Sequence, residues 1–170
     1  MSQQNSSTVT VELDRLTTEF TTEFFRAVSF ETGGTPPYEN IRALFIESGL
    51  LIKNTAATPE VSTVQQFIEP RQAMVRPGEL TRFREVELSQ TTEIFGNVAH
   101  RFSAYAKSGT IKGVVFEARG MISAQFINTP AGCKMSAMAW DDERAGLTIP
   151  LYYEPSKADV RRPAPRVRCS

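Results

Sequence analysis

The sequence is poor in side chains that hold metals and in long apolar runs. Its 170 residues include one histidine and two cysteines, too few for a zinc site built from several histidines or for a disulfide framework. No stretch approaches the roughly 18 consecutive apolar residues of a membrane helix. Gly-rich phosphate loops, the Gly-x-Ser-x-Gly elbow and the His-Glu-x-x-His motif are absent as well. We therefore expect no metal, no cofactor and no membrane partner.

Charge of either sign is not in excess, because 19 basic residues balance 19 acidic ones. A chain that binds nucleic acid through its phosphates usually carries a strongly basic face, so we expect no nucleic-acid partner. Residues 157–170 hold five basic residues against one acidic residue, and the rest of the chain holds 14 against 18. We predict a basic, Pro/Arg-rich tail at 151–170. The first residues resemble no secretory signal, which favours a cytoplasmic location.

The first half of the sequence predicts helices. After a flexible start at 1–10, apolar residues at Leu13, Leu16, Phe20, Phe24 and Ala27 follow the three-and-four spacing of one helical face, over 11–30. Two prolines open a shorter helix at about 38–47, and a short apolar run at 50–53 suits a buried strand. A third helix begins near Ser62, whose hydroxyl can cap it, and Pro70 should kink or restart that helix.

The second half predicts strands. Runs rich in Val, Phe, Thr and Ile alternate with short turn signals, which gives four long strands at about 82–95, 98–107, 112–128 and 133–142. Short turns require antiparallel neighbours, and strands this long must curl. We predict an α+β domain over 11–150, in which a cone-like curved antiparallel sheet of four long strands plus one short strand carries three N-terminal helices over its concave face.

This order of elements resembles the nuclear transport factor 2-like (SnoaL-like) superfamily, which has a cystatin-like α+β cone. Residues 24–28 (Phe-Phe-Arg-Ala-Val), 93–105 and 139–144 are similar to an uncharacterised bacterial branch of that superfamily. The resemblance covers about residues 13–150. It implies a cavity under the sheet and a homodimer, but it does not imply one reaction, because this fold hosts isomerases, dehydratases, cyclases and non-enzymes. The strand at 121–127 contains no acid, so the oxyanion acid of ketosteroid isomerase, the well-known example of this chemistry, is missing.

One residue stands out as a candidate acid or base. His100 shares a strand face with Val98 and Phe102, so it is either a core histidine held by one hydrogen bond or a pocket group able to transfer protons. Because its neighbours need burial, we expect His100 to project into the cavity. Seven aromatic residues are expected to line that cavity: Phe20, Phe24, Tyr38, Phe45, Phe67, Phe102 and Trp140.

Three functions remain open from the sequence. The first is a protein that binds a small molecule in its pocket, with no assigned reaction. The second is a proton-transfer enzyme, an isomerase, dehydratase or cyclase acting on a small apolar or polyketide-like substrate, with His100 as acid or base. The third is a non-catalytic dimeric assembly module. A sealed interior favours the third, an open cavity with a polar group in contact with water favours the second, and an open, purely apolar cavity favours the first.

Overall fold

The structure, a computed structural model, describes residues 2–154, with side chains from Thr10 onward. The predicted basic tail lies outside these residues, apart from 151–154. Helices come first and long strands second, which confirms the α+β class. The elements are α1 (Ser2–Val28), α2 (Asn40–Leu44), β1 (Phe45–Lys53), β2 (Glu60–Thr63), α3 (Val64–Val75), β3 (Leu80–Phe95), β4 (Val98–Ile111), β5 (Val114–Thr129), β6 (Gly132–Asp142) and the short 3-10 helix η1 (Leu151–Tyr153).

The sheet has six strands in the order β2-β1-β6-β5-β4-β3. β3 to β6 form the predicted antiparallel meander, but β1 pairs with β6 in parallel, with Leu51 opposite Met138. The sheet is therefore mixed rather than purely antiparallel. β2, a second short strand that the sequence analysis did not predict, pairs with β1. The expected helix at 38–47 ends at Leu44, because Phe45 already belongs to β1.

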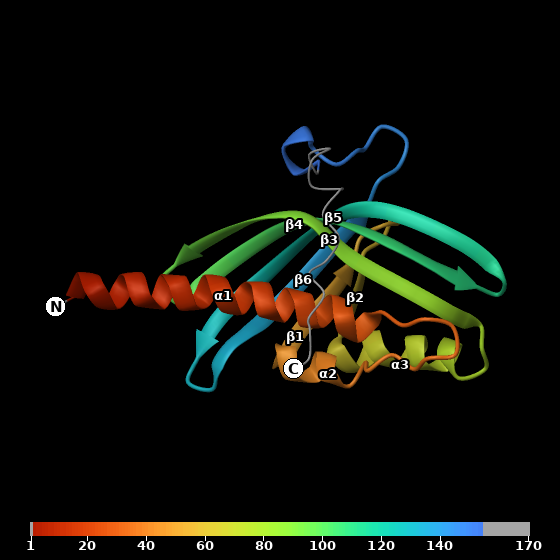
Figure 1. The fold of residues 1–170 in the computed structure, drawn as a ribbon, viewed down its shortest axis with the longest axis horizontal. Coiled ribbons are helices and arrows are strands. Elements are labelled where there is room, and N and C mark those ends of the chain that lie inside the picture. The colour runs from red at the N-terminus through yellow and green to blue at the C-terminus, as the bar shows by residue number, and fades with distance from the viewer. Residues whose placement is uncertain (1, 155–170) are drawn as a thin grey trace, which may run out of the picture.

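The helices lie under the curved sheet, on one side of it (Figure 1). α1 begins at Ser2, earlier than predicted, and its N-terminal part extends past the sheet edge (Figure 1). Its buried stripe includes Leu13, Phe24 and Ala27. α3 is capped one residue later than predicted: Thr63 Oγ1 accepts a hydrogen bond from Gln66 N, and Gln66 Oε1 accepts one from Thr63 N. It continues through Pro70 to Val75.

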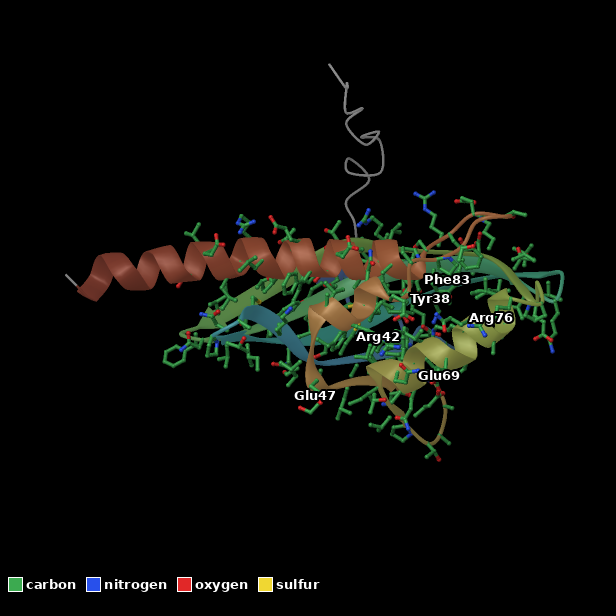
Figure 2. All side chains as sticks on the ribbon, turned by 90° about the horizontal axis from the view of Figure 1, so that it is seen from below. Tyr38, Arg42, Glu47, Glu69, Arg76 and Phe83 are labelled. Carbon is green, nitrogen blue, oxygen red and sulfur yellow. The ribbon has the colours of Figure 1, made fainter. Side chains whose placement is uncertain are left out.

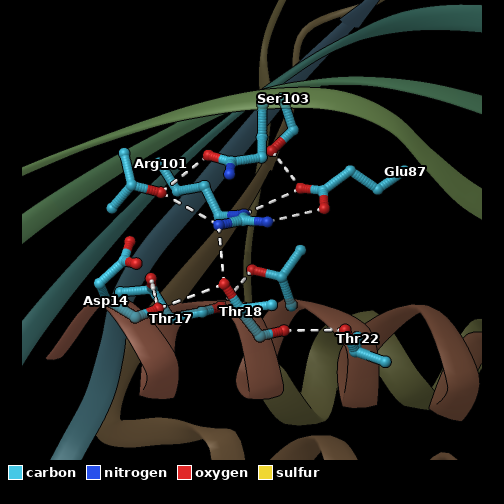
Figure 3. A network of polar contacts seen from close by, with 10 residues as sticks. Asp14, Thr17, Thr18, Thr22, Glu87, Arg101 and Ser103 are labelled. Atoms are coloured by element: carbon cyan, nitrogen blue, oxygen red, sulfur yellow. Dashed lines mark hydrogen bonds and ion pairs between the residues drawn. The ribbon is translucent and has the colours of Figure 1, made fainter. Parts of the chain in front are cut away.

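The side chains of β4 alternate between the two faces of the sheet. We call the face toward α1 and α3 the inner face. Arg101 is only 2% exposed, and its Nη1 donates to Thr18 Oγ1 of α1 at 3.2 Å (Figure 3). Arg101 therefore points inward, and so do Ser103 and Tyr105, which follow it at every second position. His100 and Phe102 point to the opposite, outer face. The prediction that His100 projects into the space under the sheet is therefore wrong. Its neighbour Arg101, which is ion-paired, occupies the inner face instead.

A bulge in β3 changes which side chains reach the inner face. The register with β4 shifts between Glu87 and Ser89. Before the bulge, Phe83 and Glu87 lie on the inner face. After it, Ser89 turns outward, and its Oγ donates to the Tyr153 carbonyl at 2.5 Å. A bulge inserts one residue and so reverses the alternation of a strand.

The outer face is partly covered by the chain after β6. Ile149 is 4% exposed, and the Tyr153 ring packs edge-on against Phe102 with a centroid distance of 5.4 Å. The rest of that face includes half-buried side chains such as Met121, Ser123 and Ile127. The core lies on the other side, where β4, β5 and β6 meet α1 and α3.

Candidate functional site

A cavity of about 310 Å³ lies between the inner face of the sheet and the helices α1 and α3. Its size is at the lower end of the range for small-molecule sites. Figure 2 views the molecule from the helical side, where Tyr38 and Phe83 lie between α1 and α3 in projection. Most of the wall is apolar, and six of its side chains are Phe24, Val28, Phe67, Met74, Phe83 and Trp140.

Aromatic rings form one continuous part of that wall. The Phe24 and Phe67 rings have centroids 6.1 Å apart, and Phe67 packs edge-on against Trp140 at 6.0 Å. Aromatic pairs favour edge-on or tilted contacts because the ring edge is positive and the ring face is negative. α1, α3 and β6 thus each supply one ring, so the wall forms only when helices and sheet are assembled.

Three charged side chains also line the cavity: Arg71 from α3, Glu85 from β3 and Lys107 from β4. Two more, Lys53 and Glu60, are exposed and line it from the paired ends of β1 and β2. Charged side chains are seldom directed at an apolar cavity in a protein core, because burial without a partner is costly. This cavity therefore combines a mainly apolar wall with charged side chains.

Glu85 is the least satisfied of these groups. Among the described residues, no hydrogen bond or ion pair reaches its carboxylate, although the residue is half-buried. Burial raises the pKa of Glu85 to about 7, against the opposing effect of the Lys107 and Arg71 charges. A carboxyl group that titrates near neutral pH beside a cavity can give or take a proton there.

Arg71 is held in place by its own helix. Its guanidinium carbon lies 3.5 Å from the centre of the Phe67 ring, and Nη1 donates to the Phe67 carbonyl at 2.7 Å. Burial lowers the pKa of Arg71, while Tyr38, Glu85 and Glu60 act in the opposite direction. An arginine keeps its charge at neutral pH all the same. The cation is thus fixed at the cavity wall.

Lys107 is neutralised by Asp142. Its Nζ lies 2.8 Å from both carboxylate oxygens of Asp142, and the Tyr105 hydroxyl donates to the same carboxylate. Burial, followed by the Asp142 hydrogen bond, raises the pKa of Tyr105 above its ordinary value. This cluster lies on the inner face, where Gly120 of β5 pairs with Asp142 of β6.

Of the seven aromatic residues expected at the pocket, Phe24, Phe67 and Trp140 line the cavity. Phe20, Tyr38 and Phe45 belong to the surrounding core but are not among its lining residues, and burial raises the pKa of Tyr38 to about 12. Phe102 lies on the outer face.

His100 does not line the cavity. Its Nε2 lies 3.0 Å from Ser123 Oγ, and its ring stacks on Phe102 with centroids 5.9 Å apart. The groups that sequence reasoning missed are Glu85 and Arg71. Phe67 and Arg71 are four residues apart, which is the spacing of neighbours on one helix face. Only the register of β3 with β4 shows that Glu85 lines the same cavity.

The six-stranded curved sheet with helices on its concave side is the nuclear transport factor 2-like fold, also called cystatin-like. A protein with this fold from Novosphingobium aromaticivorans matches with a TM-score of 0.65 at 12% identity, over 90% of this chain and 94% of that chain. A nuclear transport factor 2-like superfamily protein from Salmonella enterica matches with a TM-score of 0.64 at 12% identity, over 83% and 99%. At such identities the likeness establishes the fold.

A third similar structure, from Streptomyces avermitilis, is described as a "putative dehydratase" of the same family. It matches with a TM-score of 0.56 at 12% identity, over 76% of this chain and 95% of that chain. No family model matches the sequence, and no curated protein matches it.

Two further findings concern the described residues alone. None of their helices has the length and apolarity that a membrane crossing requires. Nor does any group of three or more His, Cys, Asp or Glu side chains within 2–154 have an arrangement suited to a metal ion.

Proposed function

We propose that this protein binds a small, mainly apolar molecule in the cavity between its sheet and its helices. The observation that carries this proposal is the combination of an aromatic wall with charged groups, Arg71 and Glu85, directed into the same space. Known small-molecule sites have this composition, in which apolar walls supply affinity and a few polar groups fix orientation. An interior sealed by packing would have favoured a purely structural module instead.

Bromobenzene is a suitable neutral probe for this proposal. We expect it to raise the melting temperature of the wild type in a concentration-dependent manner, because a ligand that binds only the folded state stabilises it. The double variant Met74→Phe/Ile111→Phe fills the cavity from α3 and β4 and should lose the effect. Val11→Phe/Val61→Phe adds two rings at exposed positions outside the cavity and should keep it. Equal shifts in all three proteins would contradict the proposal.

A second candidate function is proton transfer with Glu85 as the acid or base. The burial that raises its pKa to about 7 favours this role for Glu85 rather than His100, which lies on the other face. An isomerase, dehydratase or cyclase would use such a group, and one similar structure is described as a "putative dehydratase" of this family.

The ring opening of 5-nitro-1,2-benzisoxazole tests this candidate. A base removes the C3 proton, the N–O bond breaks, and a coloured nitrile phenolate forms. We expect a rate above buffer that rises with pH around 7 and is lost in Glu85→Gln. Glu69→Gln, an exposed glutamate on α3, is the control. A Glu85→Gln variant as active as the wild type would exclude Glu85 as the base.

We also propose that the protein is a homodimer through the outer face of its sheet. Half-buried Met121, Ile127 and Ala139 support an interface there, since a sheet with apolar residues on both faces needs a cover on each. Sedimentation should give twice the mass of one chain, and Met121→Lys should shift it toward the monomer. A clean monomer at micromolar concentration would contradict this assembly.

A further inference from the structure

The chemistry of the cavity ligand follows from the hydrogen bonds that Arg71 leaves unused. On the function proposed above, we infer that the ligand is an amphipathic monoanion, a small aromatic carboxylate whose ring packs against Phe67 and Trp140 and whose carboxylate binds the Arg71 guanidinium.

Arg71 is a preorganised donor. Its Nη1 is bonded to the Phe67 carbonyl and its guanidinium lies over the Phe67 ring. Within the described residues, however, Nε and Nη2 donate no hydrogen bond, and no carboxylate forms an ion pair with this side chain. These two N–H groups form the planar fork that matches a carboxylate with two parallel hydrogen bonds. A phosphate or sulfate would carry more charge than this single fork compensates.

The net charge of the groups that line the cavity favours an anionic ligand. Lys107 is neutralised by Asp142, which leaves Arg71 and Glu85 as the half-buried charges of the cavity that no ion pair compensates. When Glu85 holds its proton, the cavity carries one net positive charge, that of Arg71. When Glu85 is ionised, the two charges cancel and a ligand carboxylate would be repelled. Anion binding and proton uptake by Glu85 should therefore be linked.

Several other groups act on this balance from the elements around Glu85. They are Arg71 on α3, Tyr105 and Lys107 on β4, Asp142 on β6, and, at the exposed ends of β1 and β2, Lys53 and Glu60. Lys53 and Glu60 are opposite in charge and are paired in register, so they contribute no net charge. Asp142 is hydrogen-bonded to Lys107 and Tyr105, so Glu85 is the half-buried carboxyl group that can exchange a proton with the ligand site.

The size and shape of the wall restrict the rest of the ligand. The cavity of about 310 Å³ is lined by Phe24, Phe67 and Trp140 next to Arg71. A flat ring is the body that aromatic edges and faces pack against best. One aromatic ring with a carboxylate at its end meets both requirements.

The test compares 4-bromobenzoate with its neutral analogue 4-bromobenzamide by isothermal titration calorimetry. We expect the wild type to bind the acid at least tenfold more tightly than the amide, and Arg71→Gln to remove this preference. Arg76→Gln, at the end of the same helix (Figure 2), is exposed and should keep it. The acid should bind several-fold more tightly at pH 6 than at pH 8, and Glu85→Gln should remove that dependence.

The outcomes separate this inference from the function on which it rests. If bromobenzene and 4-bromobenzamide bind and the acid shows no preference, the ligand class is wrong and the apolar pocket stands. If none of the three probes binds, both are wrong. Melting curves verify that Arg71→Gln is folded, and Arg71→Lys, which keeps the charge without the fork, should retain only part of the preference.

Discussion

Arg101 of β4 and Glu87 of β3 form a two-contact ion pair between the sheet and α1. Arg101 Nε and Nη2 donate to the two carboxylate oxygens of Glu87 at 2.9 and 2.7 Å (Figure 3). Ser103 Oγ donates to Glu87 as well, at 2.6 Å, and Arg101 Nη1 donates to Thr18 and Thr92. The pair thus joins two strands to the first helix, and it fixes which face of β4 is turned inward.

Removing the arginine from this pair should be costly. Arg101→Met leaves the Glu87 carboxylate largely buried with only Ser103 as a partner, and we expect a loss of about 3–5 kcal/mol in the free energy of unfolding. Arg42→Met removes the exposed pair with Glu39 and should cost less than about 1 kcal/mol. Urea unfolding measures both. A similar small loss in the two variants would mean that the Arg101 pair does not stabilise the fold.

Glu85 should make stability depend on pH. Between its ordinary pKa of 4.5 and about 7, the folded state holds a proton that the unfolded state has lost. The free energy of unfolding should therefore fall as the pH rises through this window, by up to about 3 kcal/mol. Glu85→Gln cannot ionise and should be more stable than the wild type at pH 8. Urea unfolding at pH 5 and pH 8 measures the difference, and parallel curves for wild type and variant would contradict it.

Gly120 should tolerate no side chain. A Cβ at this position would lie 2.1 Å from the Asp141 carbonyl oxygen and 2.8 Å from the Tyr105 hydroxyl. Backbone cannot yield cheaply there, so Gly120→Ala should destabilise the protein by about 1–3 kcal/mol and disturb the Tyr105–Asp142 contact. Thermal unfolding measures the loss. An unchanged melting temperature would show that β5 and β6 can separate locally at no cost.

The fold followed from patterns that are local in the sequence. The spacing of Leu13, Phe24 and Ala27 gave the first helix, and short turns between long β-rich runs gave the meander. β2 and the parallel pairing of β1 with β6 were missed, because four residues of strand carry little pattern and a parallel neighbour leaves no turn signal.

The site depended on relationships that no local pattern contains. Alternation along β4 was read correctly, but the wrong set was assigned to the interior, because Arg101 looks like a surface residue until its partner Glu87 is known. The bulge between Glu87 and Ser89 then reverses β3 without any glycine or proline to mark it. Glu85 was not predicted at the cavity, because its inward direction follows from its pairing with Lys107, whereas Phe24, Phe67 and Trp140 were predicted to line it.

The most direct test of the cavity as a binding site uses Trp140, the single tryptophan of the chain. Bromine quenches tryptophan emission at close contact, and Trp140 forms part of the cavity wall beside Phe67. Titration with bromobenzene should quench Trp140 emission along a saturable curve, and Met74→Phe/Ile111→Phe should show only weak, linear quenching. Linear quenching of equal slope in both proteins would mean that no molecule occupies the cavity, and the proposed function would be wrong.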